Sequence, residues 1–197
     1  MIKSINNWNT QEAAKDFTPL PVDGYVCKIM GTRVQTCSNG LEMLVVSIDI
    51  LDGEFANYYA DEYRNQQNED KKWKGNLRLF IPTDERSEQA ERTRRNFKTF
   101  TNALEDSNLN YHWDWDETRL KGLKLGVVFR NEQWVFDGKS GWKAQPFKCV
   151  SVEDIETNNF TIPKEKPHKD ALPVNYPSTT EIVQELPLDD DMGDLPF

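Results

Sequence analysis

The sequence has 197 residues, of which 37% are hydrophobic and 29% are charged, a composition that suits one folded domain with polar appendages. No apolar run approaches the length of a membrane-spanning helix, so we expect no membrane partner. Three cysteines without a Cys-x-x-Cys pair, together with two histidines, lack the ligand spacing of a zinc site, and we expect no metal or other cofactor. The odd number of cysteines and the lack of a signal peptide indicate a reducing cytoplasm.

Charge is distributed unevenly along the chain. The formal net charge is −9, which by itself argues against a nucleic-acid partner. Residues 170–197, however, contain seven acids and no Lys or Arg, so residues 1–169 hold all 24 basic side chains and have a net charge of only −2. A nearly neutral domain can carry a basic groove on one face, so the charge does not exclude nucleic acid.

The first part of the chain predicts a polar arm and a β-hairpin. Residues 1–20 are mostly polar, and we expect them to form an irregular arm or a short helix that packs on the domain. Residues 24–34 and 41–51 are rich in strand-forming side chains, and the second stretch alternates with a period of two. The Ser38-Asn39-Gly40 turn between them is of the type that closes hairpins, so the two stretches predict paired antiparallel strands.

A loop-rich segment, a short strand and a helix follow. Residues 54–76 mix aromatic, polar and basic side chains, which predicts a loop-rich excursion. Residues 77–81 predict a third strand that Pro82 stops. A helix is expected to begin at 83–85, where Thr and acids suit its first turn, and to end near 106–108. Four apolar residues share one face of this helix: Ala90, Phe97, Phe100 and Leu104.

The last part of the domain predicts two more strands. Residues 123–130 form the fourth strand, and a turn at 131–132 leads into 133–136. A flexible loop at 137–141 precedes the last strand at 142–152. The order strand, strand, strand, helix, strand, strand is typical of a mainly β fold, the five-stranded OB-type Greek-key barrel with one helix between strands 3 and 4. A generic α+β sheet is the competing fold.

The composition changes near residue 164. From there prolines recur among Ser, Thr and acidic residues, and aromatics are scarce. Such a segment cannot bury enough apolar surface to offset its ordering entropy. We therefore expect a folded domain at 1–163 and a disordered acidic tail at 164–197.

The tail ends in a peptide suited to protein binding. Its last residues, 188–197, place aspartates before a Leu-Pro-Phe terminus. A Phe ring with a free α-carboxylate fits an apolar pocket with an Arg or Lys at its rim, and Pro lowers the entropy lost on docking. The aspartates attract a basic partner surface and mainly raise the association rate. The residues expected to bind a protein partner are Asp189, Asp190, Asp191, Asp194, Leu195, Pro196 and Phe197.

This ending resembles the acidic tip of bacterial and phage single-stranded DNA-binding proteins, in which aspartates precede an apolar residue, Pro and Phe. It departs from that pattern by inserting Met192-Gly193 into the acid run, which leaves the aspartates close to the terminus. The body is similar to phage-type members over short stretches, at 24–29, 51–55, 105–108 and 120–126.

The resemblance implies an OB-fold protein, not an enzyme, that coats and protects single-stranded DNA without strong sequence preference in the cytoplasm of a bacterial host. The tip would recruit proteins of phage DNA replication, recombination or repair. Members of the group occur in several oligomeric states, so a homo-oligomer stays open.

Binding of unpaired strands requires cations for phosphates and aromatic faces for bases, and each stacked base contributes on the order of 1–3 kcal/mol. Both residue types are interleaved in two parts of the sequence, the excursion with the third strand and the last two strands. In an OB barrel these parts border the binding face. The expected contacts to single-stranded DNA are Tyr58, Tyr59, Tyr63, Arg64, Lys71, Lys72, Trp73, Lys74, Arg78, Arg130, Trp134, Lys139, Trp142 and Lys143.

Some of these aromatics have an alternative place in the core. Trp134 and Phe136 share one face of a strand, so both are either buried or exposed. Trp73 lies among lysines, which favours contact with DNA over burial. For Trp142 the sequence leaves both places open.

The remaining cations divide between groove and solvent. Lys28 and Arg33 have opposite parity in one strand, so only one of them can face a groove. The helical arginines Arg92, Arg94 and Arg95 are expected to form a solvated face.

Two other classes of protein stay open. An OB-fold adaptor would join partners through the tip without binding DNA. A metal-dependent nuclease would need clustered carboxylates, and Asp114, Asp116 and Glu117 form such a cluster. The sequence contains neither a GxxxxGK[ST] phosphate loop nor a nucleophile elbow, which argues against an enzyme.

Stacking and backbone recognition discriminate weakly between nucleic acids, so RNA also stays open as a ligand.

Deletion of residues 188–197 is expected to leave the affinity for oligo-dT unchanged or to raise it. The acids of the tail mimic phosphates and compete for a basic groove, so their removal frees the groove. A fluorescence titration of the full chain and the truncated chain measures this. A clear loss of DNA affinity on truncation would contradict this account of the tail.

Overall fold

The computed structural model describes residues 3, 6, 9 and 18–169. Most of the predicted arm and the whole of the predicted tip at 188–197 lie outside the described residues. In chain order the elements are β1 (Gly24–Thr36), β2 (Glu42–Ile50), α1 (Tyr58–Asn65), β3 (Asn76–Phe80), α2 (Glu88–Ser107), the 3-10 helix η2 (Glu117–Leu120), β4 (Lys124–Phe136), β5 (Lys139–Val150) and α3 (Val152–Glu156).

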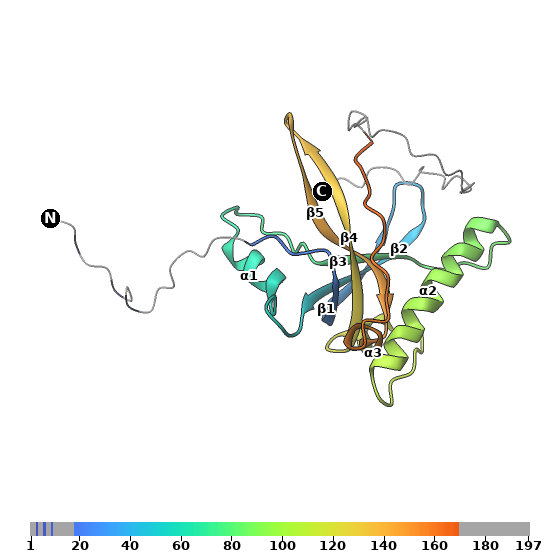
Figure 1. Ribbon diagram of the computed structural model, residues 1–197. Helices are drawn as coiled ribbons and strands as arrows, with labels where there is room; N and C mark the ends of the chain where they lie inside the picture. The colour runs from blue at the N-terminus through green and yellow to red at the C-terminus, as the bar shows by residue number, and fades with distance from the viewer. Residues whose placement is uncertain (1–2, 4–5, 7–8, 10–17, 170–197) are drawn as a thin grey trace, which may run out of the picture.

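The five strands form one antiparallel sheet in the order β3-β2-β1-β4-β5 (Figure 1). The mainly β class and the predicted order of strands with a helix between the third and fourth are thus confirmed. β3 and β5 are the two edges of this open sheet; they approach each other, but no ladder joins them within the described part of the chain. The β4–β5 hairpin extends beyond the body of the sheet (Figure 1).

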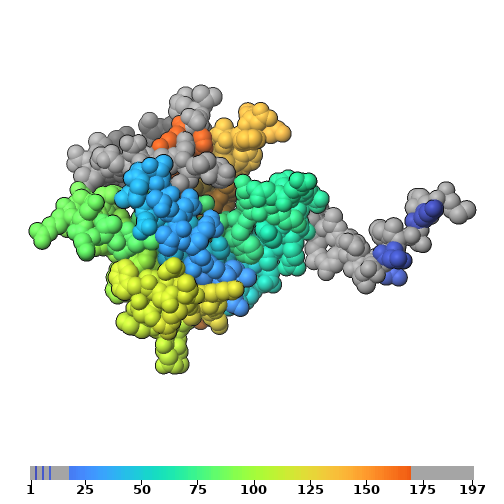
Figure 2. All heavy atoms as spheres, turned by 180° about the vertical axis from the view of Figure 1, so that it is seen from behind, coloured from blue at the N-terminus to red at the C-terminus, as the bar shows by residue number. Residues whose placement is uncertain are grey.

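The hydrophobic core lies between the sheet and α2. Its largest fully buried side chains include Phe100 of α2 and Phe129 of β4. All four residues of the predicted apolar face of the helix are buried. Seen from the reverse side, the β1–β2 hairpin (blue) lies between α2 (green) and the α1 segment (teal) (Figure 2). Cys27 and Cys149 belong to this core, and burial raises the pKa of the Cys149 thiol to about 12. Within the described ranges, every helix falls short of the length and apolarity that a bilayer span requires.

The helix α2 begins later than the sequence predicts. It starts at Glu88 rather than at 83–85, and the side chain of Ser87 caps it by accepting the Ala90 N–H. The preceding segment is held outside the helix because the Arg94 guanidinium donates to the carbonyl oxygens of Thr83 and Glu85.

The prediction of a turn at 131–132 is wrong. β4 passes through these residues without a break, and the hairpin closes with a two-residue turn at Asp137-Gly138, both with positive φ, rather than with a flexible loop at 137–141. One cause is a second partner for β4. The backbone of Lys166 donates to the Asn131 carbonyl and accepts from the Gln133 N–H. Residues 165–168 therefore lie along β4, although the sequence assigns them to the tail.

The predicted loop at 54–76 contains the helix α1. Its own N-cap residue, Asn57, makes no side-chain cap and has a left-handed backbone. The cap comes instead from Asp49 on β2, whose buried carboxylate accepts the N–H groups of Tyr59 at 2.9 Å and Ala60 at 3.1 Å. The same carboxylate accepts the Ile50 N–H at 3.0 Å. A carboxylate at a helix N-terminus also interacts favourably with the helix dipole, so Asp49 fixes α1 against the sheet.

Replacement of Asp49 by Ala should lower the free energy of unfolding by about 3 kcal/mol, because three backbone donors lose a charged acceptor in a buried place. Chemical denaturation measures the change. The exposed Asp70 provides a matched control, and Asp70→Ala should change stability by less than about 0.5 kcal/mol. Equal effects of the two substitutions would show that Asp49 does not anchor α1.

Candidate nucleic-acid interface

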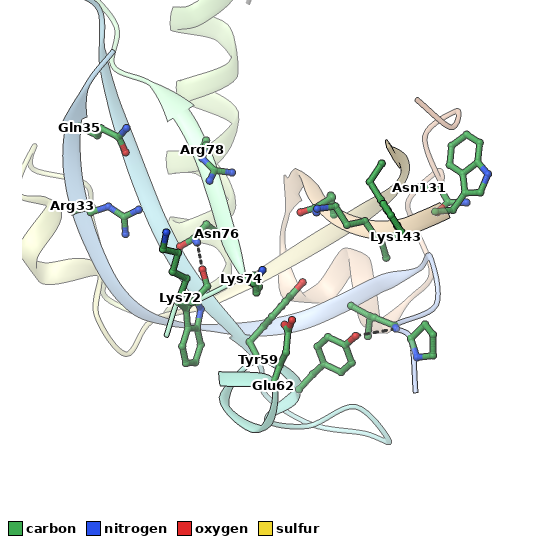
Figure 3. Close-up of a pocket in the computed structure, with 18 residues that line it drawn as sticks. Arg33, Gln35, Tyr59, Glu62, Lys72, Lys74, Asn76, Arg78, Asn131 and Lys143 are labelled. Carbon is green, nitrogen blue, oxygen red and sulfur yellow. Dashed lines mark hydrogen bonds between the residues drawn. The ribbon is translucent and has the colours of Figure 1, made fainter. Parts of the chain in front are cut away.

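A groove of about 760 Å³ lies between the two edges of the sheet, and we call it the basic groove. Residues of β1, α1, the α1–β3 loop, β3 and the β4–β5 hairpin line it (Figure 3). Its charged lining consists of one carboxylate, Glu62, and five cations: Arg33, Lys72, Lys74, Arg78 and Lys143. The cations come from three different parts of the fold, so the folded chain gathers positive charge that the sequence disperses.

The cations of the basic groove disfavour one another. Desolvation lowers the pKa of the Arg78 guanidinium, and the neighbouring Arg33 lowers it further. Desolvation also lowers the pKa of Lys143, and Lys74 adds to that effect. A bound polyanion would relieve this repulsion, because each phosphate stabilises the charged form of the cations around it.

Two tryptophans of the β4–β5 hairpin lie at the groove with their rings accessible. Trp142 is 44% exposed and Trp134 is 36% exposed. The indole of Trp134 lies over Gly141, where an added Cβ would come within 2.8 Å of the ring. Phe136, on the same face as Trp134, is 77% exposed. The alternative in which Trp134 and Phe136 both belong to the core is therefore excluded, and two exposed faces are available for stacking.

The tryptophan on the opposite wall is fixed in place. Trp73 is half-buried against the core, and its indole N–H donates to the carbonyl oxygens of Ile48 at 3.0 Å and Gly75 at 3.1 Å. The side chain of Asn76 donates to the Trp73 carbonyl at 2.6 Å. Trp73 therefore forms a rigid wall of the basic groove, and only part of its ring faces the groove.

Tyr59 is among the lining residues of the basic groove, yet it offers almost no surface to a ligand. Its side chain is only 4% exposed and belongs to the hydrophobic core, with its ring packed on Gly75. The reason is α1: a helical turn directs Tyr59 inward, toward the sheet. Tyr58 lines the basic groove, and its hydroxyl accepts the Leu20 N–H at 3.2 Å.

Five of the expected contacts lie outside the lining of the basic groove. On the α1 side, Lys71 lies over the ring of Tyr63, and Arg64 pairs with Asp61 at 2.7 Å. On the hairpin, the Arg130 guanidinium lies 3.9 Å from the centre of the Phe147 ring and donates to Glu132 at 2.5 Å. The five residues are Tyr63, Arg64, Lys71, Arg130 and Lys139; the other expected contacts all line the groove.

The basic groove also contains polar residues that the sequence analysis missed. Gln35, Asn76, Asn131 and Gln145 line it, and Arg33 rather than Lys28 is the β1 cation that does so. The alternation of Arg33 and Gln35 on β1 was a usable signal, because residues two apart in a strand share a face. No signal in the sequence pointed to Asn131, because its place depends on the pairing of β4 with residues far along the chain.

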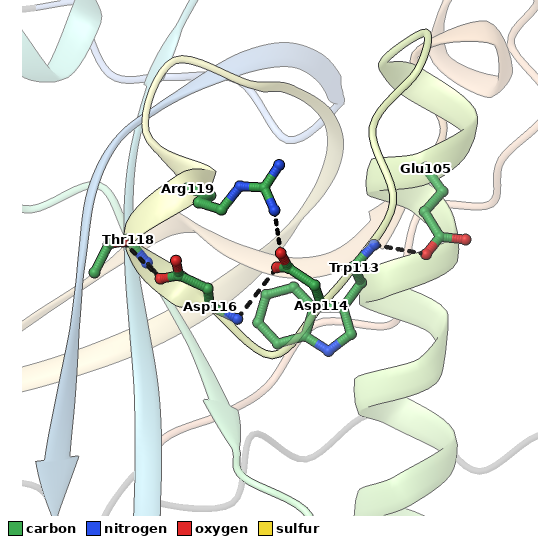
Figure 4. A network of polar contacts seen from close by, with 6 residues as sticks. All are labelled: Glu105, Trp113, Asp114, Asp116, Thr118 and Arg119. Carbon is green, nitrogen blue, oxygen red and sulfur yellow. Dashed lines mark hydrogen bonds and ion pairs between the residues drawn. The ribbon is translucent and has the colours of Figure 1, made fainter.

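The carboxylates of the connector before η2 are engaged by residues of η2. Asp114 pairs with Arg119, and Asp116 accepts from the Thr118 N–H at 3.0 Å and from its hydroxyl at 2.6 Å (Figure 4). Glu105 of α2 accepts the Trp113 N–H at 3.0 Å. Among the residues that the structure describes, no group of His, Cys, Asp or Glu has an arrangement that could hold a metal ion.

No protein-family model matches this sequence, and no curated protein matches it with significance.

Replacement of Gly141 by Ala should displace the ring of Trp134 while lowering stability by less than about 1 kcal/mol. Gly141 is not among the residues with positive φ, so Ala is allowed there, and the exposed ring can move away from the new methyl group. The tryptophan emission spectrum of the protein measures the displacement. Gly141→Ala in a Trp134→Phe background is the control, because any change there comes from the other tryptophans. An unchanged spectrum would contradict the placement of the ring on Gly141.

Proposed function

We propose that the protein binds single-stranded DNA in the basic groove. The observation that carries this proposal is the lining itself: five cations against one carboxylate, with the accessible rings of Trp134 and Trp142 beside them. Cations that track a backbone and rings that stack on bases are the two elements of sequence-independent binding to unpaired strands. In duplex DNA the bases are already stacked, so the rings favour single strands.

The arrangement of the strands supports the same proposal. We infer that the sheet is an OB-type barrel that is open between β3 and β5. OB folds are partly open five-stranded barrels that bind single strands with strands 2 and 3 and with the loops joining strands 1 to 2 and 4 to 5. In this chain β3 and the β4–β5 hairpin supply four of the five charged or tryptophan side chains that line the groove from strands: Arg78, Trp134, Trp142 and Lys143.

The C-terminal tip gives the proposal its second part. We propose that 188–197 recruits proteins of replication, recombination or repair to DNA held in the basic groove. The tip lies outside the described residues, and its support is the sequence alone: aspartates followed by Leu-Pro-Phe.

Oligo-dT should quench the tryptophan fluorescence of the full chain, and the affinity should fall as salt rises, because binding releases counterions.

Trp142→Leu should weaken binding by about 1–3 kcal/mol through the loss of one stacked base. Arg78→Gln should weaken it and reduce the salt dependence by about one ion. Duplex DNA of the same length should bind more weakly at each salt concentration.

Two control variants lie outside the basic groove. Trp115→Leu removes an exposed tryptophan, and Lys121→Gln removes an exposed cation; neither should change the affinity. Equal losses for groove and control variants would reject the groove as the site. If the wild-type chain caused no quenching, the adaptor function would be favoured. Magnesium-dependent cleavage of DNA that Asp114→Ala abolishes would instead identify a nuclease.

A further inference from the structure

Glu62 is the only carboxylate among the described residues that line the basic groove. It lies on α1 and extends toward the groove beside Tyr59 (Figure 3). The cap that Asp49 provides fixes α1, so the fold holds this carboxylate among the cations. A carboxylate repels phosphates, so the position of Glu62 is unfavourable for a groove that binds them.

Two lysines are the electrostatic partners of Glu62. Burial raises the pKa of its carboxyl, whereas Lys74 and Lys143 act in the opposite direction and favour the ionised form. The other acid near Lys143 is Glu132, and it is already paired with Arg130 at 2.5 Å. Glu62 is therefore the acid within the groove that can offset the repulsion between Lys74 and Lys143.

We propose that Glu62 is an internal counterion that competes with DNA phosphates for Lys74 and Lys143 and so limits the affinity of the basic groove. This inference rests on the proposed function. In the empty groove the carboxylate lowers the repulsion between the lysines. When a strand enters, the lysines exchange Glu62 for phosphate, and the carboxylate then repels the strand. Long, flexible lysine side chains permit this exchange.

The exchange limits the affinity for DNA without weakening the stacking surfaces. Electrostatics between Glu62, Lys74 and Lys143 limit the affinity, and the rings of Trp134 and Trp142 keep their stacking faces. A different role for a carboxylate in such a groove is to accept a hydrogen bond from the amino group of a base, as acids do with cytosine N4. Thymine has no amino group, so oligo-dT and oligo-dC separate the two roles.

The test compares the full-length wild type, Glu62→Gln, Glu62→Asp and Asp61→Asn in titrations with oligo-dT and oligo-dC at several salt concentrations. Glu62→Gln should bind both oligonucleotides about fivefold more tightly at low salt, since one repulsive charge is removed at short range. Its salt dependence should steepen by about one ion, because Lys74 and Lys143 then hold solution anions that DNA must release. Glu62→Asp keeps the charge and should stay within about twofold of the wild type.

Asp61→Asn is the matched control. Asp61 lies on the same helix, is paired with Arg64 and lies outside the groove lining, so its loss should change the affinity less than about twofold. Equal tightening by Asp61→Asn and Glu62→Gln would overturn the proposal in favour of a general charge effect. Unchanged or weaker binding by Glu62→Gln, or a loss confined to oligo-dC, would also overturn it. Failure of the wild type to bind either oligonucleotide would reject the proposed function itself.

Discussion

The rest of this structure depends on one constraint, the repulsion between like charges that lie between the sheet edges β3 and β5. Arg33, Arg78 and Lys143 face a common space, and the lowered pKa of Arg78 and of Lys143 reflects both desolvation and mutual repulsion. Such an arrangement persists only if other interactions hold the walls. The fold supplies these interactions on the α1 side of the groove, where the indole of Trp73 donates to two backbone carbonyls and Asp49 caps α1.

These interactions also explain how the two walls differ. The α1 wall is rigid, because Trp73 and Tyr59 pack against the core. The hairpin wall presents Trp134 and Trp142 with accessible rings on strands that extend beyond the body of the sheet. Cations on both walls, with accessible rings on the hairpin wall, suit a ligand whose backbone and bases need different surfaces. A single strand of nucleic acid is such a ligand.

Local signals in the sequence predicted much of the fold. The Asn-Gly turn after β1 and the apolar spacing of α2 are set by neighbouring residues, and both predictions are confirmed. The helix α1 was missed because its cap is a side chain on another strand, and the burial of Tyr59 follows from that helix. The unbroken course of β4 at Asn131 was missed for a similar reason, since its partner segment lies more than 30 residues later. Within the candidate site, the lysines near Trp73 and the hairpin tryptophans could be predicted from interleaved composition. The place of Arg130 outside the groove lining could not, because it depends on contacts with Phe147 and Glu132.

The central claim is that unpaired DNA lies in the basic groove between β3 and β5. Hydrogen exchange of the full chain, with and without oligo-dT, tests it most directly, because it reports on every part of the backbone at once. The account predicts slower exchange confined to residues near 72–78 and 141–145 and unchanged exchange at 109–119. Slower exchange at 109–119, with no change at the two groove segments, would contradict it.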